Sequence, residues 1–295
     1  MSLNSLLYGK VTFNEPLALH TSMKVGGPAC VLIEPETVKQ LCALIKDAGG
    51  IGISVFVIGE GCNIIVGSEG IDNICVKLSA PVFREIKFSN TSVKVGAGAS
   101  LSGLLIAAGE KSLGGYEFLS GIPGTIGGAI FGNAGAHDKT ISSLLKEVEI
   151  IDPDGKINKI KAKDIKFDYR ASDLGSNIII SAIFRFKKSN KNESKALSRT
   201  NLIRKINLQD YTAPSAGCVF KNPKGSAFSA GELIERSGLK GKVYGGAVVS
   251  GKHANFILNK NNAKSQDIMS LIELIKKKVK SDCGVKLEEE VMVIK

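Results

Sequence analysis

Two glycine-rich segments are the part of this sequence best suited to hold a ligand. The first, residues 59–63 (GEGCN), directly follows an apolar run, and the second, residues 121–136, has glycine at six of its sixteen positions. Closely spaced glycines let the backbone turn so that several N–H groups converge on one anion, such as a phosphate. The first segment is equally compatible with an ordinary tight turn, whereas the second favours dinucleotide binding.

The second segment carries glycine at every fourth position, at Gly124, Gly128 and Gly132. On a helix this spacing would give one face without side chains, and Pro123 would stand at the first helical position. Helical glycine costs roughly 0.5–1 kcal/mol relative to alanine, so stability does not explain the spacing. We expect a ligand phosphate close to the backbone at this helix N-terminus, with close helix–sheet packing as the alternative.

Neither segment matches the common nucleotide-binding loops. A GxGxxG loop followed about twenty residues later by an acidic side chain is absent from the sequence, and so is a Walker loop. The six cysteines form no CxxC pair or zinc spacing, and the three histidines, His20, His137 and His253, are far apart. These observations argue against a Rossmann or P-loop assignment and predict no metal site.

The elements that must position these loops alternate at the start of the chain. Short apolar runs predict strands over 29–34 and 53–58, and the spacing of Val38, Leu41 and Leu44 predicts a helix over 37–48. Such a β-α-β unit indicates a sheet with a ligand at its strand ends.

From about residue 74 the pattern changes to short strands, which indicates an α+β region with an antiparallel sheet. The turn 152–155 (DPDG) predicts a hairpin. The polar segment 187–198 is interpreted as a domain boundary that leads into a helix, and 199–280 as a further α+β block. A helix is predicted over 101–110, and strands over 74–78, 82–88, 92–96, 147–151, 156–161, 177–186 and 288–294.

The chain carries a formal charge of +11, which raises the question of an anionic partner. A basic chain can bind nucleic acid or an anionic membrane surface, so a non-catalytic nucleotide- or nucleic-acid-binding protein stays an alternative. Basic residues interleaved with aromatic stacking platforms are missing, however, and lysines 276–278 lie in an amphipathic helical pattern typical of a solvated face. We therefore attribute the charge to compositional bias, since Asn and Ile are also frequent, together with anionic small ligands, and we expect no nucleic acid.

Membrane insertion is not expected from the sequence. No apolar run approaches the roughly 18 residues of a membrane span, and the first residues lack a basic region followed by a long apolar one. We expect a cytoplasmic protein with reduced thiols.

Further motifs accompany the glycine segments in a fixed order. They are HTSMKVGGP at 20–28, YR at 169–170, AGCVFKNP at 216–223, AGELIE at 230–235 and HANFI at 253–257. With the glycine segments, these motifs make the sequence resemble the UDP-N-acetylenolpyruvoylglucosamine reductase family, in its shorter type II form, over nearly the whole chain. The long substrate-clamping loop of the type I form has no counterpart here, judged by chain length.

The resemblance implies an α+β fold in three parts. Residues 1–78 and 79–188 would form the two subdomains of a FAD-binding region of vanillyl-alcohol-oxidase type. Residues 189–295 would form a C-terminal α+β substrate domain whose final strand returns toward the active site, and we expect a monomer. Residues of both glycine segments would contact FAD, namely Gly59, Glu60, Gly61, Cys62, Asn63, Ile64, Gly121, Pro123, Gly124, Thr125, Gly127, Gly128, Asn133 and Ala134.

The resemblance also implies a reaction. NADPH reduces the flavin and leaves, and the enolpyruvyl ether of a UDP-linked amino sugar then enters the same site. Hydride from flavin N5 reaches the terminal vinyl carbon, and a general acid protonates the adjacent carbon. The product, UDP-N-acetylmuramate, serves peptidoglycan precursor synthesis and so cell-wall biogenesis, cell shape and cell division.

Three residues receive catalytic roles through the resemblance. Arg170 would face the substrate carboxylate, and Glu290, if protonated through a raised pKa, would donate a hydrogen bond to it. Cys218 would be the acid, where better-known members carry serine, and its ordinary pKa of about 8.5 makes a thiol a better proton donor than an alcohol. Taken without the resemblance, Arg170 could equally be a surface ion-pair partner and Glu290 part of a solvated acidic strand. Cys218 could equally be a buried structural cysteine.

Substrate contacts are expected at three further positions. Asn222 resembles a substrate-contacting asparagine of the family, and Lys221 and Lys240 would meet the UDP phosphates, although these lysines could equally be solvated. His253 lies in a family motif, where we expect structural hydrogen bonding. An alternative function is that of another flavin oxidase or dehydrogenase of the same fold.

Overall fold

Capping side chains start several helices of the computed structural model, which describes residues 5–294. The Thr37 hydroxyl accepts from the amide of Gln40, whose side chain accepts in return from the amide of Thr37, and Ser229 and Glu232 repeat this capping box. The helices are α1 (Ser5–Tyr8), α2 (Val38–Gly50), α3 (Leu101–Glu110), α4 (Ile126–Phe131), α5 (Lys191–Leu208), α6 (Ala230–Arg236) and α7 (Ser265–Cys283).

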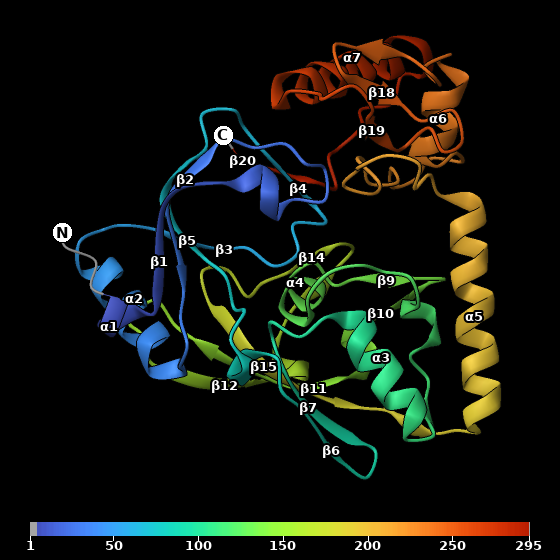
Figure 1. The fold of residues 1–295 in the computed structure, drawn as a ribbon. Helices are drawn as coiled ribbons and strands as arrows, with labels where there is room; N and C mark the ends of the chain where they lie inside the picture. The colour runs from blue at the N-terminus through green and yellow to red at the C-terminus, as the bar shows by residue number, and fades with distance from the viewer. Residues whose placement is uncertain (1–4, 295) are drawn as a thin grey trace. The chain divides into compact units, whose positions relative to one another are not determined.

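The first sheet contains the predicted β-α-β unit, and its strand order is β1-β2-β5-β3 (Figure 1). Helix α2 connects β2 to β3 and buries Leu41, Leu44 and Ile45, and β3 pairs in parallel with β5, which lies between β2 and β3 in the sheet. The strand predicted over 53–58 is confirmed but is shorter than expected. The strands of this sheet are β1 (Lys10–Pro16), β2 (Pro28–Glu34), β3 (Val55–Val57) and β5 (Ile71–Val76).

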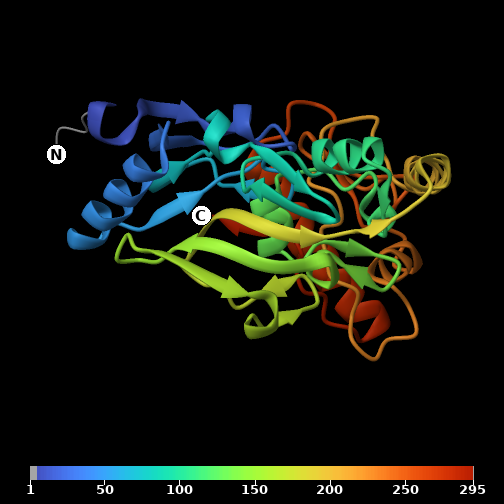
Figure 2. The same cartoon turned by 90° about the horizontal axis from the view of Figure 1, so that it is seen from below.

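An antiparallel sheet follows in the chain, as predicted, with the order β12-β11-β15-β7-β6 (Figure 2). The DPDG turn joins β11 to β12, with Gly155 at a φ of +78°. The strands are β6 (Ile86–Ser89), β7 (Ser92–Gly96), β11 (Leu145–Ile151), β12 (Ile157–Lys161) and β15 (Ile178–Arg185). Short pairs elsewhere are β8 (Leu113–Gly114) with β16 (Lys187–Lys188), β9 (Gly135–Ala136) with β10 (Lys139–Thr140), and β13 (Phe167–Asp168) with β14 (Ala171–Ser172).

The prediction of one strand over 82–88 is wrong in its first half. Residues Pro81–Phe83 form a 3-10 turn, and strand β6 starts only at Ile86. Pro81 has its φ fixed and has no N–H to give to a strand ladder, which favours a turn at this point.

The C-terminal region forms a separate antiparallel sheet of β17 (Val243–Tyr244), β18 (Ala247–Val249) and β19 (Ile257–Asn259). Helix α7 buries an apolar face that includes Ile268, Leu271 and Ile275, and it ends at Gly284 with a φ of +70°. The last strand, β20 (Met292–Ile294), pairs in parallel with β4 (Ile64–Val66) and is shorter than the strand predicted over 288–294.

Two compact units result from these contacts. Unit 1 comprises the described parts of 1–13, 31–59 and 73–203, and unit 2 those of 14–30, 60–72 and 204–295. Each unit has its own apolar core, with Phe83 and Phe184 buried in unit 1 and Met23 and Phe220 buried in unit 2. The three-part division at residues 78 and 188 stays a prediction.

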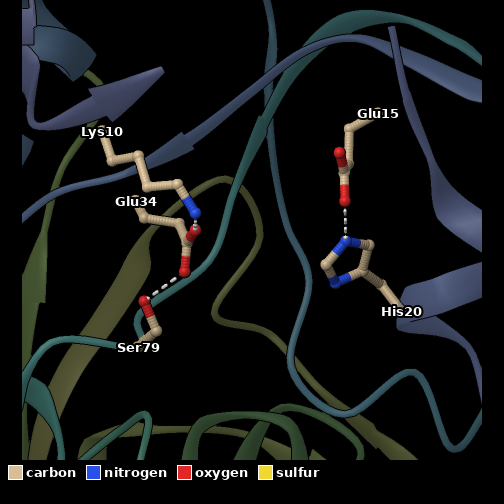
Figure 3. A network of polar contacts seen from close by, with 5 residues as sticks. All are labelled: Lys10, Glu15, His20, Glu34 and Ser79. Atoms are coloured by element: carbon tan, nitrogen blue, oxygen red, sulfur yellow. Dashed lines mark hydrogen bonds and ion pairs between the residues drawn. The ribbon is translucent and has the colours of Figure 1, made fainter. Parts of the chain in front are cut away.

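Polar contacts fix strand β1 at two places (Figure 3). In unit 1, Lys10 and Ser79 both bind the carboxylate of Glu34, at 3.0 and 2.6 Å. In unit 2, Nε2 of His20 lies 2.8 Å from Oε1 of Glu15. Over residues 5–294, none of the helices combines the length and apolar character needed to span a membrane.

Candidate active site

The second glycine segment does not form the predicted helical stripe. Helix α4 covers only Ile126–Phe131, so that Gly124 precedes it and Gly132 is its C-cap. Gly124 has a φ of +117°, a conformation that a helix cannot contain. Pro123 stands two residues before the N-cap, Thr125, and therefore does not occupy the first helical position.

The first turn of α4 does not offer the free amides that the predicted phosphate contact needs. The first two helical amides are engaged within the protein, since Ile126 donates to the carbonyl of Ala99 at 2.9 Å and Gly127 to that of Ala97 at 2.8 Å. The amide of Gly128 donates to the hydroxyl of the N-cap threonine at 3.3 Å. These three donors are satisfied without an anion, so the close packing of helix and neighbouring backbone, which was the alternative, describes this turn better.

The same segment nevertheless contains a polar atom that lacks a partner. The side chain of Asn133 is buried, with 3% of its surface exposed, and its Nδ2 donates to the carbonyl of Asp168 at 3.0 Å. Its Oδ1 is buried and accepts no hydrogen bond among the described residues. Such an orphaned acceptor costs about 1–3 kcal/mol unless a ligand supplies a donor.

Space beside the glycine bend is consistent with a ligand along this segment. A Cβ atom built on Gly124 would meet no heavy atom of the described chain within 4 Å. The open side of Gly124 and the orphaned oxygen of Asn133 together fit a cofactor that carries N–H and O–H donors, as FAD does.

The first glycine segment meets the second at one point in unit 1. A Cβ atom on Gly59 would lie 2.6 Å from Oγ1 of Thr125, so that only glycine fits against the capping threonine. The structure therefore brings together two predicted cofactor residues that are far apart in the sequence.

Arg170 lies beside the second glycine segment, also in unit 1. Its Nη2 donates to the carbonyl of Gly135 at 3.1 Å, and its guanidinium carbon lies 5.3 Å from the ring centroid of Tyr169. Arg170 has a φ of +56°, which marks a bend that Ser172 ties to the carbonyl of Phe131 at 2.8 Å. The predicted arginine is thus held next to the cofactor segment by local contacts.

The remaining residues of the first segment belong to unit 2. Gly61 has a φ of +62° and packs against the backbone of His20, and its carbonyl accepts from the amide of Ser22 at 3.1 Å. Burial, followed by the charge of Glu60, raises the pKa of the Cys62 thiol to about 11. Cys62 is therefore neutral near pH 7 and is no nucleophile there.

Cys218 and Glu290 come close together in unit 2, although they are far apart in the sequence. The amide of Glu290 donates at 2.7 Å to the carbonyl of Val219, the residue that follows Cys218. The carbonyl of Glu290 accepts from Nδ2 of Asn63 at 3.1 Å. Two predicted catalytic residues and one predicted cofactor residue are therefore linked by a single hydrogen-bond network.

Asn255, which the sequence analysis did not assign, fixes the 218–220 segment that carries Cys218. Its Oδ1 accepts from the amide of Phe220 at 2.9 Å, and its Nδ2 donates to the carbonyl of the same residue at 2.8 Å. The carbonyl of Asn255 also accepts from the amide of Val219 at 2.9 Å. Asn255 is buried, and its side-chain amide thus replaces a neighbouring strand for one residue.

Two further titratable side chains accompany this network. Partial burial, followed by the nearby charge of Cys218, raises the pKa of Tyr211, a largely exposed side chain, so the phenol and the thiol are electrostatic neighbours. The pKa of His253 is lowered, mainly because the ring is partly buried. A backbone hydrogen bond raises this pKa by a smaller amount, and the positive charge of Lys240 lowers it further. Nδ1 of His253 accepts from the amide of Asn255 at 3.3 Å, so the structural hydrogen bonding predicted for this histidine is confirmed.

The predicted substrate-contacting residues lie in different surroundings. Oδ1 of Asn222 accepts from the amide of Ala230 at 3.0 Å, at the start of α6. Nζ of Lys240 lies 2.7 Å from Oε1 of Glu235. Lys221 adjoins the 218–220 segment and is partly buried. Their roles toward a substrate stay predictions.

Family models divide the chain in two parts. The FAD binding domain matches residues 29–161, and the C-terminal domain of UDP-N-acetylenolpyruvoylglucosamine reductase matches residues 209–294. The fold and these two matched domains thus define a FAD-binding flavoprotein oxidoreductase.

Curated relatives share nearly the whole length of the chain. A UDP-N-acetylenolpyruvoylglucosamine reductase of Clostridium botulinum is 40% identical over 285 residues, which are 95% of this chain and 92% of that protein. UDP-N-acetylenolpyruvoylglucosamine reductase 1 of Bacillus cereus is 38% identical over 289 residues, with 97% and 95% covered. The chain belongs to the UDP-N-acetylenolpyruvoylglucosamine reductase family, so the resemblance seen in the sequence is confirmed; the type II assignment stays a prediction.

Solved structures agree with this assignment. The crystal structure of the reductase from Thermus caldophilus superposes with a TM-score of 0.83 at 30% identity and covers 97% of this chain and 98% of its own. The 6-hydroxy-D-nicotine oxidase from Arthrobacter nicotinovorans superposes with a TM-score of 0.51. The match covers 64% of this chain and 44% of that chain at 11% identity, so it shows a shared fold only. The predicted α+β fold with a FAD-binding region and a C-terminal α+β domain is confirmed.

Proposed function

We propose that this protein reduces the enolpyruvyl ether of UDP-N-acetylglucosamine to UDP-N-acetylmuramate with NADPH, in peptidoglycan precursor synthesis. The proposal is carried by the backbone hydrogen bond between Glu290 and Val219, which holds Glu290 close to Cys218. Membership in the reductase family supplies the reaction class, in which an acid and a carboxyl group are both needed.

Residues of unit 1 would hold FAD, which supplies the hydride for the vinyl carbon of the substrate. Oδ1 of Asn133 would accept a hydrogen bond from the bound group, and the open side of Gly124 would leave room for it. Arg170 is placed beside this segment by its bond to Gly135. A guanidinium stays charged at every relevant pH and can bind the substrate carboxylate through two N–H groups.

Cys218 would supply the proton for the substrate carbon adjacent to the terminal vinyl carbon, which receives the hydride. The 218–220 segment is held by the side chain of Asn255 and by the amide of Glu290, so its position is set by backbone hydrogen bonds. Proton donation leaves a thiolate, and a proton from solvent restores the thiol before the next turnover.

Glu290 would stabilise the negative charge that develops on the substrate carboxylate during reduction. In its protonated form it would donate a hydrogen bond to a carboxylate oxygen, as neutral carboxylic acids do in apolar sites. Lys221 and Lys240 would face the diphosphate of the UDP group, and Asn222 the sugar.

The test of this proposal is substrate-dependent consumption of NADPH. Purified protein with bound flavin should oxidise NADPH rapidly only when the UDP-enolpyruvyl sugar is present, and mass spectrometry should find a product heavier by two hydrogens. If NADPH oxidation requires oxygen and its rate does not depend on the sugar, the protein would instead be an oxidase of the same fold.

We further infer a cytoplasmic, monomeric enzyme. The substrates are nucleotides of the cytoplasm, and one chain supplies all the residues assigned to the reaction. Light scattering of the purified flavoprotein should give the mass of one chain, 31.2 kDa, and a mass of twice this value would contradict the monomer.

A further inference from the structure

Helix α7 holds the segment that carries Glu290 through one ion pair. Nζ of Lys276 lies 2.8 Å from Oε1 of Glu289 and 3.1 Å from Oε1 of Glu273. The side chains of Lys276 and Glu289 are only 27% and 30% exposed. The hydrogen bond to Glu289 raises the pKa of Lys276, so this lysine is charged whenever the enzyme works.

The chain around Glu289 is fixed to the segment that carries Cys218. Glu289 forms a β-bridge with Phe220, and the chain bends at the next residue, where the amide of Glu290 donates to Val219. The ion pair of Glu289 with α7 and the hydrogen bond from the Glu290 amide to Val219 therefore fix the chain on both sides of the Glu289–Glu290 peptide bond.

We propose that Lys276 is a positioning residue for the reduction, which fixes the orientation of the 288–290 segment by binding Glu289 and so directs Glu290 toward the reacting carboxylate. The inference rests on the proposed function, because it takes Glu290 as the group that stabilises charge. Lys276 itself touches neither substrate nor cofactor in this proposal.

A purely structural role explains the ion pair less well. Helix α7 is already fixed by its buried apolar face, including Ile272 and Val279, and by its glycine C-cap. Partly exposed ion pairs contribute little to folding. Loss of the ion pair should therefore lower the rate of substrate reduction, because a small rotation of a catalytic carboxyl group slows a reaction. It should leave the melting temperature unchanged.

The experiment compares half-reactions of the intact flavoprotein. Lys276→Met keeps the length of the side chain and removes its charge, and Glu289→Gln removes the partner charge. Lys278→Met is the matched control, because Lys278 forms a pair of similar length with Asp282 on the same helix, at 2.7 Å. Flavin reduction by NADPH and anaerobic reoxidation by the UDP-enolpyruvyl sugar are followed separately by stopped flow.

We expect reoxidation to slow by roughly five-fold in Lys276→Met and in Glu289→Gln, a size that a partly exposed ion pair can support. Flavin reduction, flavin content and melting temperature should match those of the wild type and of Lys278→Met. The exchange Lys276→Glu with Glu289→Lys, made together with Glu273→Gln so that no like charge faces residue 276, should restore most of the reoxidation rate, because it rebuilds the pair in reverse.

Equal reoxidation rates in Lys276→Met and Lys278→Met would overturn the positioning role, and so would a charge exchange slower than either single variant. A melting temperature that falls together with the rate of both half-reactions would also overturn it in favour of a structural role. Failure of the wild type to be reoxidised by the sugar is a different result, because it would refute the proposed function itself.

Discussion

At the scale of single residues, the proposed chemistry rests on two features. Cys218 precedes two residues whose backbone is bound by Asn255 and Glu290. Asn133 keeps one buried oxygen without a partner among the described residues. A buried polar atom left unsatisfied, such as this oxygen, carries an energetic cost and is a usual sign of a functional site.

Replacing Cys218 separates the proton-transfer step from flavin reduction. Cys218→Ser should retain turnover, because a hydroxyl can still donate a proton from the same position. Cys218→Ala should lower overall turnover by about 10²–10⁴-fold, the usual contribution of a general acid, while flavin reduction by NADPH continues. Steady-state and stopped-flow rates measure the two effects, and unchanged turnover in Cys218→Ala would refute the role.

Replacing Asn133 tests the cofactor site. Asn133→Ala should bind FAD about ten-fold more weakly or worse, because one lost hydrogen bond in a buried site is worth about 1–3 kcal/mol. Fluorescence titration of the apoprotein with FAD gives the dissociation constant. Asn158→Ala, in the exposed hairpin at Asp152, is the control. Equal affinity in the two variants would place the cofactor elsewhere.

At the scale of elements, local sequence patterns predicted much of the fold. The strand over 92–96 and the helix over 101–110 have the predicted bounds, because apolar alternation and a Ser100 cap act within the element itself. The glycine stripe failed, because spacing alone does not show that Gly124 adopts a φ of +117°. Pairings between distant residues, such as Asn255 with Phe220, leave no local pattern and were missed.

The hydrogen bonds of Asn255 should matter for the segment that carries Cys218. Asn255→Ala removes two buried hydrogen bonds to the backbone of Phe220 and should lower the free energy of unfolding by about 2 kcal/mol, at about 1 kcal/mol each. Urea unfolding measures the change, with Asn261→Ala at an exposed position as the control. A loss no larger than that of Asn261→Ala would show that these bonds are dispensable.

At the scale of the whole molecule, stability should depend on pH through a partly buried histidine, His253. Burial lowers the pKa of His253 below the ordinary 6.5, so the folded protein binds this proton less readily than the unfolded chain does. The contribution of neutral His253 is therefore complete above pH 6.5 and decreases as the pH falls below that value.

Urea unfolding between about pH 5 and pH 8 checks this dependence. The wild type should lose stability toward the acid end, and His253→Gln should lose less of it over the same interval. Asp210, whose pKa is lowered because hydrogen bonds from Ser250 and Thr212 outweigh its burial, responds only at lower pH. Parallel curves for the wild type and His253→Gln would exclude the histidine as the cause.

Electrons should pass from NADPH to an enolpyruvyl sugar through this one chain, and a single-turnover experiment decides whether they do. The flavoprotein is reduced with one equivalent of NADPH without oxygen, and the UDP-enolpyruvyl sugar is then added. We predict that the yellow absorbance returns at once and that one equivalent of UDP-N-acetylmuramate forms. A flavin that stays bleached until air is admitted would rule this function out.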